Sequence, residues 1–119
     1  MITIAIADDS AFHCEILSLY VKNHSNLSIS IEVANGADLI NELNKCPQLP
    51  KICILDLHMP IMDGIATAKI INRQFPDLRV FGYTSSKNSE EIDQYSKFVN
   101  KVFNKDCPAA LFQEINHIM

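Results

Sequence analysis

Two stretches of sequence decide the fold: residues 2–9, which read ITIAIADD, and residues 52–56, which read ICILD. Each is a short apolar run that ends in aspartate, a pattern typical of a parallel strand buried on both faces. The carboxyl ends of neighbouring parallel strands meet at one edge of a sheet, where open α/β folds bind their ligands. We therefore expect Asp8, Asp9 and Asp56 to lie together at that edge.

Three clustered carboxylates repel one another, so they stay ionised only when a cation or a basic side chain sits among them. Ligands that offer only oxygen favour a hard cation, and a small site with few carboxylates favours Mg²⁺. The first hypothesis is accordingly an acidic Mg²⁺ pocket, built from Asp8, Asp9 and Asp56, that handles a phosphoryl group.

The composition is that of one globular domain. The chain has 119 residues, of which 48% are hydrophobic and 20% charged, which suits a single core and argues against disorder. The net charge is −4 and no Lys/Arg cluster is present, so we expect no nucleic-acid binding by this domain itself. Apolar runs are too short to span a membrane and the N-terminus lacks a signal-peptide pattern, so we expect no membrane partner and a cytoplasmic protein.

The cysteines predict neither a zinc site nor a disulfide framework. They stand at positions 14, 46, 53 and 107, with no C-x-x-C pair and no Cys/His spacing that suits zinc. Cys53 falls in the middle of a buried strand pattern and is expected to be a small core residue. Since nothing else in the chain favours secretion, disulfides are not expected.

Strand and helix patterns alternate five times along the chain. The predicted strands cover residues 2–8, 27–34, 51–56, 78–84 and 101–104, and a helical pattern follows each of them. Residues 28–33 alternate serine or glutamate with isoleucine or valine, which marks a half-exposed strand at an edge of the sheet. The chain therefore predicts an α/β fold of the flavodoxin-like type, a five-stranded parallel sheet in the order 2-1-3-4-5 with helices on both faces.

The helices have recognisable starts and apolar faces. Three of them follow a residue that can cap a helix, namely Ser10, Asp63 and Asn88. The last helix has Pro108 in its first turn, after Asp106 or Cys107 as the cap. In the first helix we expect an inward face of Phe12, Ile16, Leu19 and Tyr20. In the last helix we expect an inward face of Leu111, Phe112, Ile115 and Ile118.

Two further polar residues fall at the carboxyl ends of predicted strands. Thr84 ends the fourth strand and Lys105 follows the fifth, so both belong to the edge that holds the acids. Three carboxylates, a hydroxyl and an ammonium suit transfer of a phosphoryl group to Asp56, with Mg²⁺ and Lys105 neutralising the equatorial oxygens. Thr84 can donate a hydrogen bond to one of those oxygens.

With these residues in this order, the chain resembles the receiver domain of two-component response regulators over its whole length, residues 1–119. The resemblance rests on Asp8-Asp9, on residues 55–64, on Thr84-Ser85 and on Lys105, each after the expected strand. It implies a signalling domain, not an enzyme, that accepts a phosphoryl group on Asp56 from a sensor histidine kinase or a small phosphodonor.

The resemblance also implies roles for individual residues. Asp9 binds Mg²⁺ directly, Asp8 binds it largely through water, and Asp56 and the backbone carbonyl of His58 are further ligands. Thr84 and Lys105 contact the phosphoryl group. Phosphorylation then draws Thr84 inward and shifts the face formed by the fourth helix, the fifth strand and the fifth helix.

The subfamily is suggested by the C-terminal half. Residues 76–80, Lys105-Asp106 and the pattern around residues 108–115 resemble LuxR/NarL-type regulators, which carry a DNA-binding domain after the receiver. The resemblance favours a receiver that controls a C-terminal DNA-binding domain absent from this chain, over a single-domain regulator. It also suggests homodimers that are weak or depend on phosphorylation.

The chain departs from the family pattern around the fifth strand. Asp106 follows Lys105 where many receivers have proline, so we predict a trans peptide bond between them. Val102 stands where an aromatic switch residue is usual, and Phe103, one residue later, is expected to point to the opposite face. The segment from Thr84 to Lys105 is shorter than usual, which predicts a short or irregular fourth helix.

Two other functions remain open at the level of sequence. A phosphohydrolase of the haloacid-dehalogenase type also uses an aspartate nucleophile and Mg²⁺, but has a second aspartate where this chain has His58. A receiver that acts as a phosphorylation-independent protein-binding module is the other alternative, and the unusual fifth strand supports it. The side chains of His58 and Ser86 either tune the phosphoryl lifetime or are ordinary solvent-facing loop residues.

Overall fold

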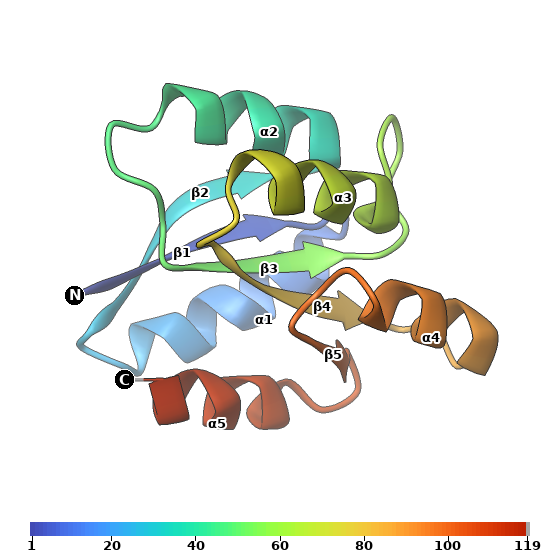
Figure 1. The fold of residues 1–119 in the computed structure, drawn as a ribbon. Helices are drawn as coiled ribbons and strands as arrows, with labels where there is room; N and C mark the ends of the chain where they lie inside the picture. The colour runs from blue at the N-terminus through green and yellow to red at the C-terminus, as the bar shows by residue number, and fades with distance from the viewer. Residues whose placement is uncertain (119) are drawn as a thin grey trace.

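The structure is a computed structural model and describes residues 1–118. A single five-stranded sheet lies between two layers of helices (Figure 1). Its strands are β1 (Ile2–Ala7), β2 (Leu27–Val33), β3 (Ile52–Asp56), β4 (Arg79–Thr84) and β5 (Lys101–Asn104). All neighbouring strands are parallel and their order is β2-β1-β3-β4-β5, so the predicted flavodoxin-like topology is confirmed.

The helices are α1 (Ala11–Lys22), α2 (Gly36–Lys45), α3 (Gly64–Gln74), α4 (Ser89–Ser96) and α5 (Pro108–Ile118). Helices α2 and α3 cover one face of the sheet and α1 and α5 cover the other, while α4 lies beside the carboxyl end of β4 (Figure 1). Helix α4 has eight residues, so the prediction of a short fourth helix is confirmed. None of the helices within residues 1–118 has the length and apolar character needed to cross a membrane.

The sheet separates two apolar clusters, and β1 and β3 contribute to both. Alternate residues of these strands pack on the α2/α3 side, namely Ala5, Ala7, Cys53 and Leu55. The residues between them pack on the α1/α5 side, namely Ile4, Ile6, Ile52 and Ile54. Burial on both faces explains why these two strands are almost continuously apolar. Cys53 is a core residue, as predicted, and all four cysteines are free.

Strand β2 lies at the edge of the sheet, as its alternating sequence predicts, but it contains a bulge. The pairing passes from Ile4 opposite Ile29 to Ala5 opposite Ile31, which leaves one extra residue in β2. Ile29 therefore packs on the α1/α5 side and Ile31 on the α2/α3 side. The alternation of residues 28–33 predicts that both side chains lie on one face of the sheet, and the bulge shows that this prediction is wrong.

The predicted inward face of α1 is wrong at Phe12 and Leu19. Phe12 and Leu19 are 67% and 56% exposed, whereas the buried residues of this helix are Leu17 and Val21. Together with Cys14, which is partly buried against the same cluster, Leu17 and Val21 form the stripe that faces the sheet. Most positions of α1 are apolar, so a stripe through residues 12, 16, 19 and 20 fits the sequence as well as the observed stripe through residues 14, 17 and 21.

Other predicted contacts of the α1/α5 layer are present. Tyr20 packs against this cluster and stacks on Phe112, with ring centroids 4.8 Å apart. Leu111 and Ile115 are fully buried, and Ile118 is partly buried at the end of α5. The α5 face is therefore confirmed, and Tyr20 marks the point where the predicted and observed faces of α1 overlap.

The predicted helix starts are confirmed. Side-chain oxygens accept hydrogen bonds from first-turn N–H groups at Ser10 (from His13, 3.3 Å), Asp63 (from Ala66, 2.9 Å) and Asn88 (from Glu91, 3.1 Å). Helix α5 begins at Pro108, directly after Cys107. The carboxylate of Asp106 pairs with Lys87.

Candidate functional site

The structure brings three acids together at the carboxyl edge of the sheet. Asp8 and Asp9 follow β1, Asp56 ends the adjacent strand β3, and one carboxylate oxygen of each lies within 4.8 Å of the others. Asp8 and Asp56 are buried, whereas Asp9 is exposed. The pairing of β1 with β3 is what turns two distant sequence positions into one acidic cluster.

Lys105 provides the positive charge of this cluster. Its Nζ lies 2.8 Å from Oδ2 of Asp8 and 3.3 Å from Oδ2 of Asp56. The lysine is 8% exposed, so both ion pairs are largely shielded from water. The residue directly after β5 thus reaches across the edge of the sheet to the acids of β1 and β3.

The charge balance around Asp56 is incomplete. Burial and the neighbouring Asp8 carboxylate raise the pKa of Asp56 to about 7, although Lys105 acts to lower it. Oδ2 of Asp8 is buried and accepts no hydrogen bond of regular geometry, even with Lys105 beside it. An all-oxygen cluster with spare acceptor capacity and excess negative charge fits a hard divalent cation such as Mg²⁺.

Thr84 is buried at the carboxyl end of β4, next to Lys105. The backbone N–H of Lys105 donates to the Thr84 carbonyl at 2.9 Å, so the two residues occupy neighbouring strand ends. The Thr84 hydroxyl oxygen accepts a 3.1 Å hydrogen bond from the N–H of Ser86. This bond holds the hydroxyl on the side of the loop that connects β4 to α4, residues 85–88.

The loop between β3 and α3, residues 57–63, carries His58 past the acids. Its ends are fixed by hydrogen bonds from Gly64 N–H to the Leu57 carbonyl and from Gly36 N–H to the Met62 carbonyl, at 2.8 and 3.2 Å. Gly64 is required here, because a Cβ atom would lie 2.4 Å from the Asp56 carbonyl oxygen. Ile61, at the exposed tip, has a φ of 70°, which is unfavourable for a β-branched residue.

The β5 strand has the side-chain directions that its sequence predicts. Phe103 packs on the α1/α5 side, edge-to-face with Phe81, whereas Val102 packs on the α2/α3 side. The Lys105–Asp106 peptide bond is trans, as predicted, and so are all other peptide bonds of residues 1–118. A fully buried aromatic side chain on the Val102 side comes from α4 and belongs to Tyr95.

Three contacts made by two residues of α4 were missed by sequence reasoning. The Tyr95 hydroxyl donates a 2.5 Å hydrogen bond to the carbonyl oxygen of Leu55, one residue before Asp56. Both carboxylate oxygens of Glu91 are also engaged, one with Nε2 of His58 and the other with the Ser86 hydroxyl, each at 2.6 Å. Hydrogen bonds from Ser86 and His58 lower the pKa of Glu91.

A partial signal for these contacts was present in the sequence. Glu91 and Tyr95 are four residues apart, so they share one face of α4. Asn88 and Glu91 have the spacing of a capping box, which predicts a role for Glu91 only at the start of the helix. Its backbone N–H does bond to Asn88, but its carboxylate points to the site loops instead.

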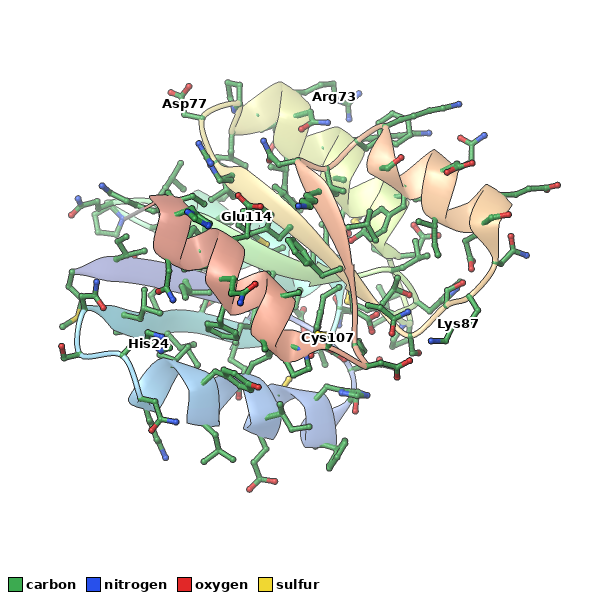
Figure 2. All side chains as sticks on the ribbon, turned by 90° about the horizontal axis from the view of Figure 1, so that it is seen from below. His24, Arg73, Asp77, Lys87, Cys107 and Glu114 are labelled. Atoms are coloured by element: carbon green, nitrogen blue, oxygen red, sulfur yellow. The ribbon has the colours of Figure 1, made fainter. Side chains whose placement is uncertain are left out.

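The loops that follow β4 and β5 are joined outside the acidic cluster. Lys87 forms an ion pair with Asp106, and the Asn104 side chain donates to the Ser86 carbonyl at 3.3 Å. In Figure 2, Lys87 and Cys107 lie on the side of the molecule where β4 and β5 end, whereas His24 lies on the opposite side, beyond the C-terminal end of α1. Asp106, in the position where many receivers have proline, thus ties the Lys105 loop to the Thr84 loop.

A doubly wound sheet in this order, with acids at the carboxyl ends of β1 and β3, a threonine at the end of β4 and a lysine after β5, defines a CheY-like α/β receiver fold. The model of the response regulator receiver domain family matches residues 4–115, and the chain belongs to this family.

Curated relatives share only part of their length with this chain. One is a protein-glutamate methylesterase/protein-glutamine glutaminase from Oceanobacillus iheyensis, 38% identical over 72 residues that cover 60% of this chain and 20% of that protein. Another is the uncharacterized transcriptional regulatory protein YhcZ from Bacillus subtilis, 29% identical over 89 residues that cover 75% of this chain and 41% of that protein. The receiver is therefore the part that these larger proteins have in common with the chain.

Solved structures agree with the fold and the family. RcsB from Salmonella enterica serovar Typhimurium, bound to the promoter rprA in the presence of phosphomimetic BeF3-, has a TM-score of 0.81 at 26% identity, covering 94% of this chain and 67% of that chain. The response regulator domain of Thermotoga maritima CheB has a TM-score of 0.80 at 19% identity, covering 98% of this chain and 95% of that chain. At that lower identity the second likeness concerns the fold alone.

Proposed function

We propose that the chain, residues 1–119, is a phosphoacceptor signalling domain in which Asp56 receives a phosphoryl group from a sensor histidine kinase, with Mg²⁺ as cofactor. The observation that carries this proposal is the position of Lys105, whose ammonium contacts both Asp8 and Asp56. A lysine held among three acids at the edge of a receiver sheet suits the charge of a transferred phosphoryl group.

In the proposed reaction, a carboxylate oxygen of Asp56 forms a bond to phosphorus while the bond between phosphorus and the donor nitrogen breaks. Asp8, Asp9, Asp56 and the backbone carbonyl of His58 would hold Mg²⁺. Bound Mg²⁺ supplies positive charge for the phosphoryl oxygens. Lys105 moves from its carboxylate partners to the new acyl phosphate.

Thr84 is the proposed sensor of that product. Its hydroxyl, now an acceptor from Ser86 N–H, turns inward to donate to a phosphoryl oxygen. Because Ser86 lies in the loop that leads into α4, this turn pulls on the loop and shifts the face formed by α4, β5 and α5.

The output of the domain is inferred from two relatives. The relative YhcZ is described as a transcriptional regulatory protein, and RcsB is described as bound to a promoter. We propose that this receiver, located in the cytoplasm, controls a C-terminal DNA-binding domain and forms homodimers that depend on phosphorylation. The alternative is a single-domain or phosphorylation-independent receiver, and it is favoured by the absence of an aromatic residue at Val102.

The test is the intact mass of the protein after incubation with acetyl phosphate or phosphoramidate and Mg²⁺. We expect one added phosphoryl group of about 80 Da, absent from Asp56→Asn and from a sample in EDTA. Repeated turnover of the donor without a stable adduct would favour a phosphohydrolase. A folded wild-type protein that gains no mass would favour the phosphorylation-independent module. Light scattering with and without a phosphate mimic tests whether dimers depend on phosphorylation. A molar mass that does not change would contradict that dependence.

A further inference from the structure

Helix α4 is attached to the rest of the protein by few side chains. Of its eight residues only Tyr95 is buried, and the other side chains are mostly polar. One turn earlier, Glu91 has a side chain that is 29% exposed and both carboxylate oxygens occupied. Glu90, its neighbour in the same first turn, is exposed, and its carboxylate forms no hydrogen bond or ion pair with the residues that the structure describes, so the two glutamates differ in role.

The partners of Glu91 lie on both loops that border the proposed phosphorylation site. His58 is two residues after Asp56, and its Nε2 lies 2.6 Å from Oε1 of Glu91. Ser86 is two residues after Thr84, and its hydroxyl donates to Oε2 of Glu91 at 2.6 Å. One carboxylate on α4 therefore bridges the loop that carries the phosphoacceptor and the loop that carries the threonine.

The bridge reaches Thr84 through one more hydrogen bond. The Ser86 hydroxyl is fixed by Glu91, and the backbone N–H of the same serine donates to the Thr84 hydroxyl oxygen at 3.1 Å. The Ser86 hydroxyl also accepts from the N–H of Asn88, the cap of α4. Movement of Thr84 toward a phosphoryl group therefore strains the contacts that fix the start of α4.

We propose that Glu91 is a positioning residue that holds His58 and Ser86 in the arrangement of the unphosphorylated state, and so slows phosphorylation of Asp56. This inference rests on the proposed function. While it is paired with Glu91, the His58 imidazole is not available to donate to an incoming phosphodonor, and the carboxylate adds negative charge beside a loop of the site. Phosphorylation requires the Glu91 contacts to loosen, which connects Asp56 chemistry to α4.

The experiment compares the wild type with Glu91→Gln and with Glu90→Gln, which removes the same charge from the same helix turn without touching the bridge. Rates of mass gain are measured with phosphoramidate and Mg²⁺. We expect Glu91→Gln to be phosphorylated about threefold faster or more, and Glu90→Gln to match the wild type. In a His58→Ala background the effect of Glu91→Gln should fall well below that of the single change, because the imidazole it releases is missing.

A second readout needs no phosphodonor. In amide NMR spectra of the unphosphorylated proteins, Glu91→Gln should shift the Thr84 and Ser86 signals, and Glu90→Gln should not. If the wild type is phosphorylated and the wild type, Glu91→Gln and Glu90→Gln react at the same rate, the inference is wrong while the proposed function stands. If the wild type gains no phosphoryl group, the proposed function fails, and the inference fails with it whatever the spectra show.

Discussion

The hydroxyl of Tyr95 donates a 2.5 Å hydrogen bond to the carbonyl oxygen of Leu55, so the C-terminal half of α4 is fixed to β3 directly beside Asp56. The ring of Tyr95 occupies the space above Gly82 of β4, where an added Cβ atom would lie 2.6 Å from a ring carbon. A glycine in the sheet and a tyrosine on α4 are therefore matched, and together they position the helix that borders the site.

We predict that Tyr95→Phe lowers the free energy of unfolding by about 1–3 kcal/mol, because it removes the hydrogen bond that the Tyr95 hydroxyl donates to the buried Leu55 carbonyl. Chemical denaturation monitored by circular dichroism measures this change. The control is Tyr20→Phe, which removes a hydroxyl from a partly buried ring that stacks on Phe112 and should change stability less. Equal effects of both substitutions would contradict the role of the Leu55 bond.

The match between Gly82 and Tyr95 gives a second prediction. Gly82→Ala should destabilise the wild type by about 1–3 kcal/mol, because the new methyl group overlaps the Tyr95 ring. In a Tyr95→Leu background the same change should cost distinctly less, since the ring is gone. Denaturation of the two single variants and the double variant completes the cycle, and strict additivity would show that the two sites do not interact.

Lys105 is predicted to act as a counterion that competes with a metal. Lys105→Met leaves Asp8 and Asp56 without their shared cation, so the metal-free protein should lose about 2–4 kcal/mol of stability. The same variant should bind Mg²⁺ more tightly, because a positive charge has left the cluster. Thermal unfolding with and without Mg²⁺, together with calorimetric titration, measures both effects.

The matched control for this substitution is Lys101→Met. Lys101 lies in β5 and pairs with Glu114, but its side chain is 58% exposed, so the pair contributes little. We expect nearly unchanged stability and Mg²⁺ affinity. Equal effects of the two lysine substitutions on stability and on Mg²⁺ affinity would show that Lys105 does not neutralise Asp8 and Asp56.

The sequence alone was enough to predict the sheet and the acidic cluster because both follow from short-range patterns. Strands buried on both faces are apolar throughout, and the topology of five alternating units then places Asp8 and Asp56 on adjacent strand ends. Thr84 and Lys105 were located by the same rule. No detailed knowledge of packing was needed for any of these positions.

The rest depended on contacts that a local pattern does not contain. The inward face of α1 was predicted wrongly at Phe12 and Leu19 because most positions of this helix are apolar, so the sequence does not single out the packed stripe of Cys14, Leu17 and Val21. The bulge in β2 moved Ile29 and Ile31 to opposite faces, although the alternation continues unbroken in the sequence. Glu91 satisfied a capping pattern, and only the fold shows that its carboxylate reaches His58.

Cysteine alkylation should follow exposure and the pKa of each thiol. Burial, Asp8 and Glu32 raise the pKa of Cys14 to about 11, and burial raises the pKa of Cys53 to about 12. At pH 8 both hold very little thiolate, the reactive form. With iodoacetamide, exposed Cys107 should react first, Cys14 far more slowly, and Cys53 only after unfolding. Peptide mass spectrometry over time measures the order, and fast modification of Cys14 would contradict it.

The raised pKa of Asp56 predicts that this proposed phosphoacceptor destabilises the metal-free protein. The folded protein keeps this proton up to pH of about 7, whereas the unfolded chain releases it near the ordinary aspartate value of 3.8. The folded state therefore binds more protons in this window, so this contribution to stability is lost as the pH rises from about 4 to about 7.

Asp56→Asn removes the buried charge and keeps the shape of the side chain. In EDTA at pH 8 we expect it to raise the free energy of unfolding by about 1–3 kcal/mol, with the gain shrinking toward pH 4, where the wild-type carboxyl is protonated. The control is Asp77→Asn, on an exposed loop that Figure 2 shows far from Lys87 and Cys107. Saturating Mg²⁺ should raise the free energy of unfolding of the wild type and should not raise that of the Asp56 variant. A gain that is independent of pH would mean that the charge of Asp56 is not its cause.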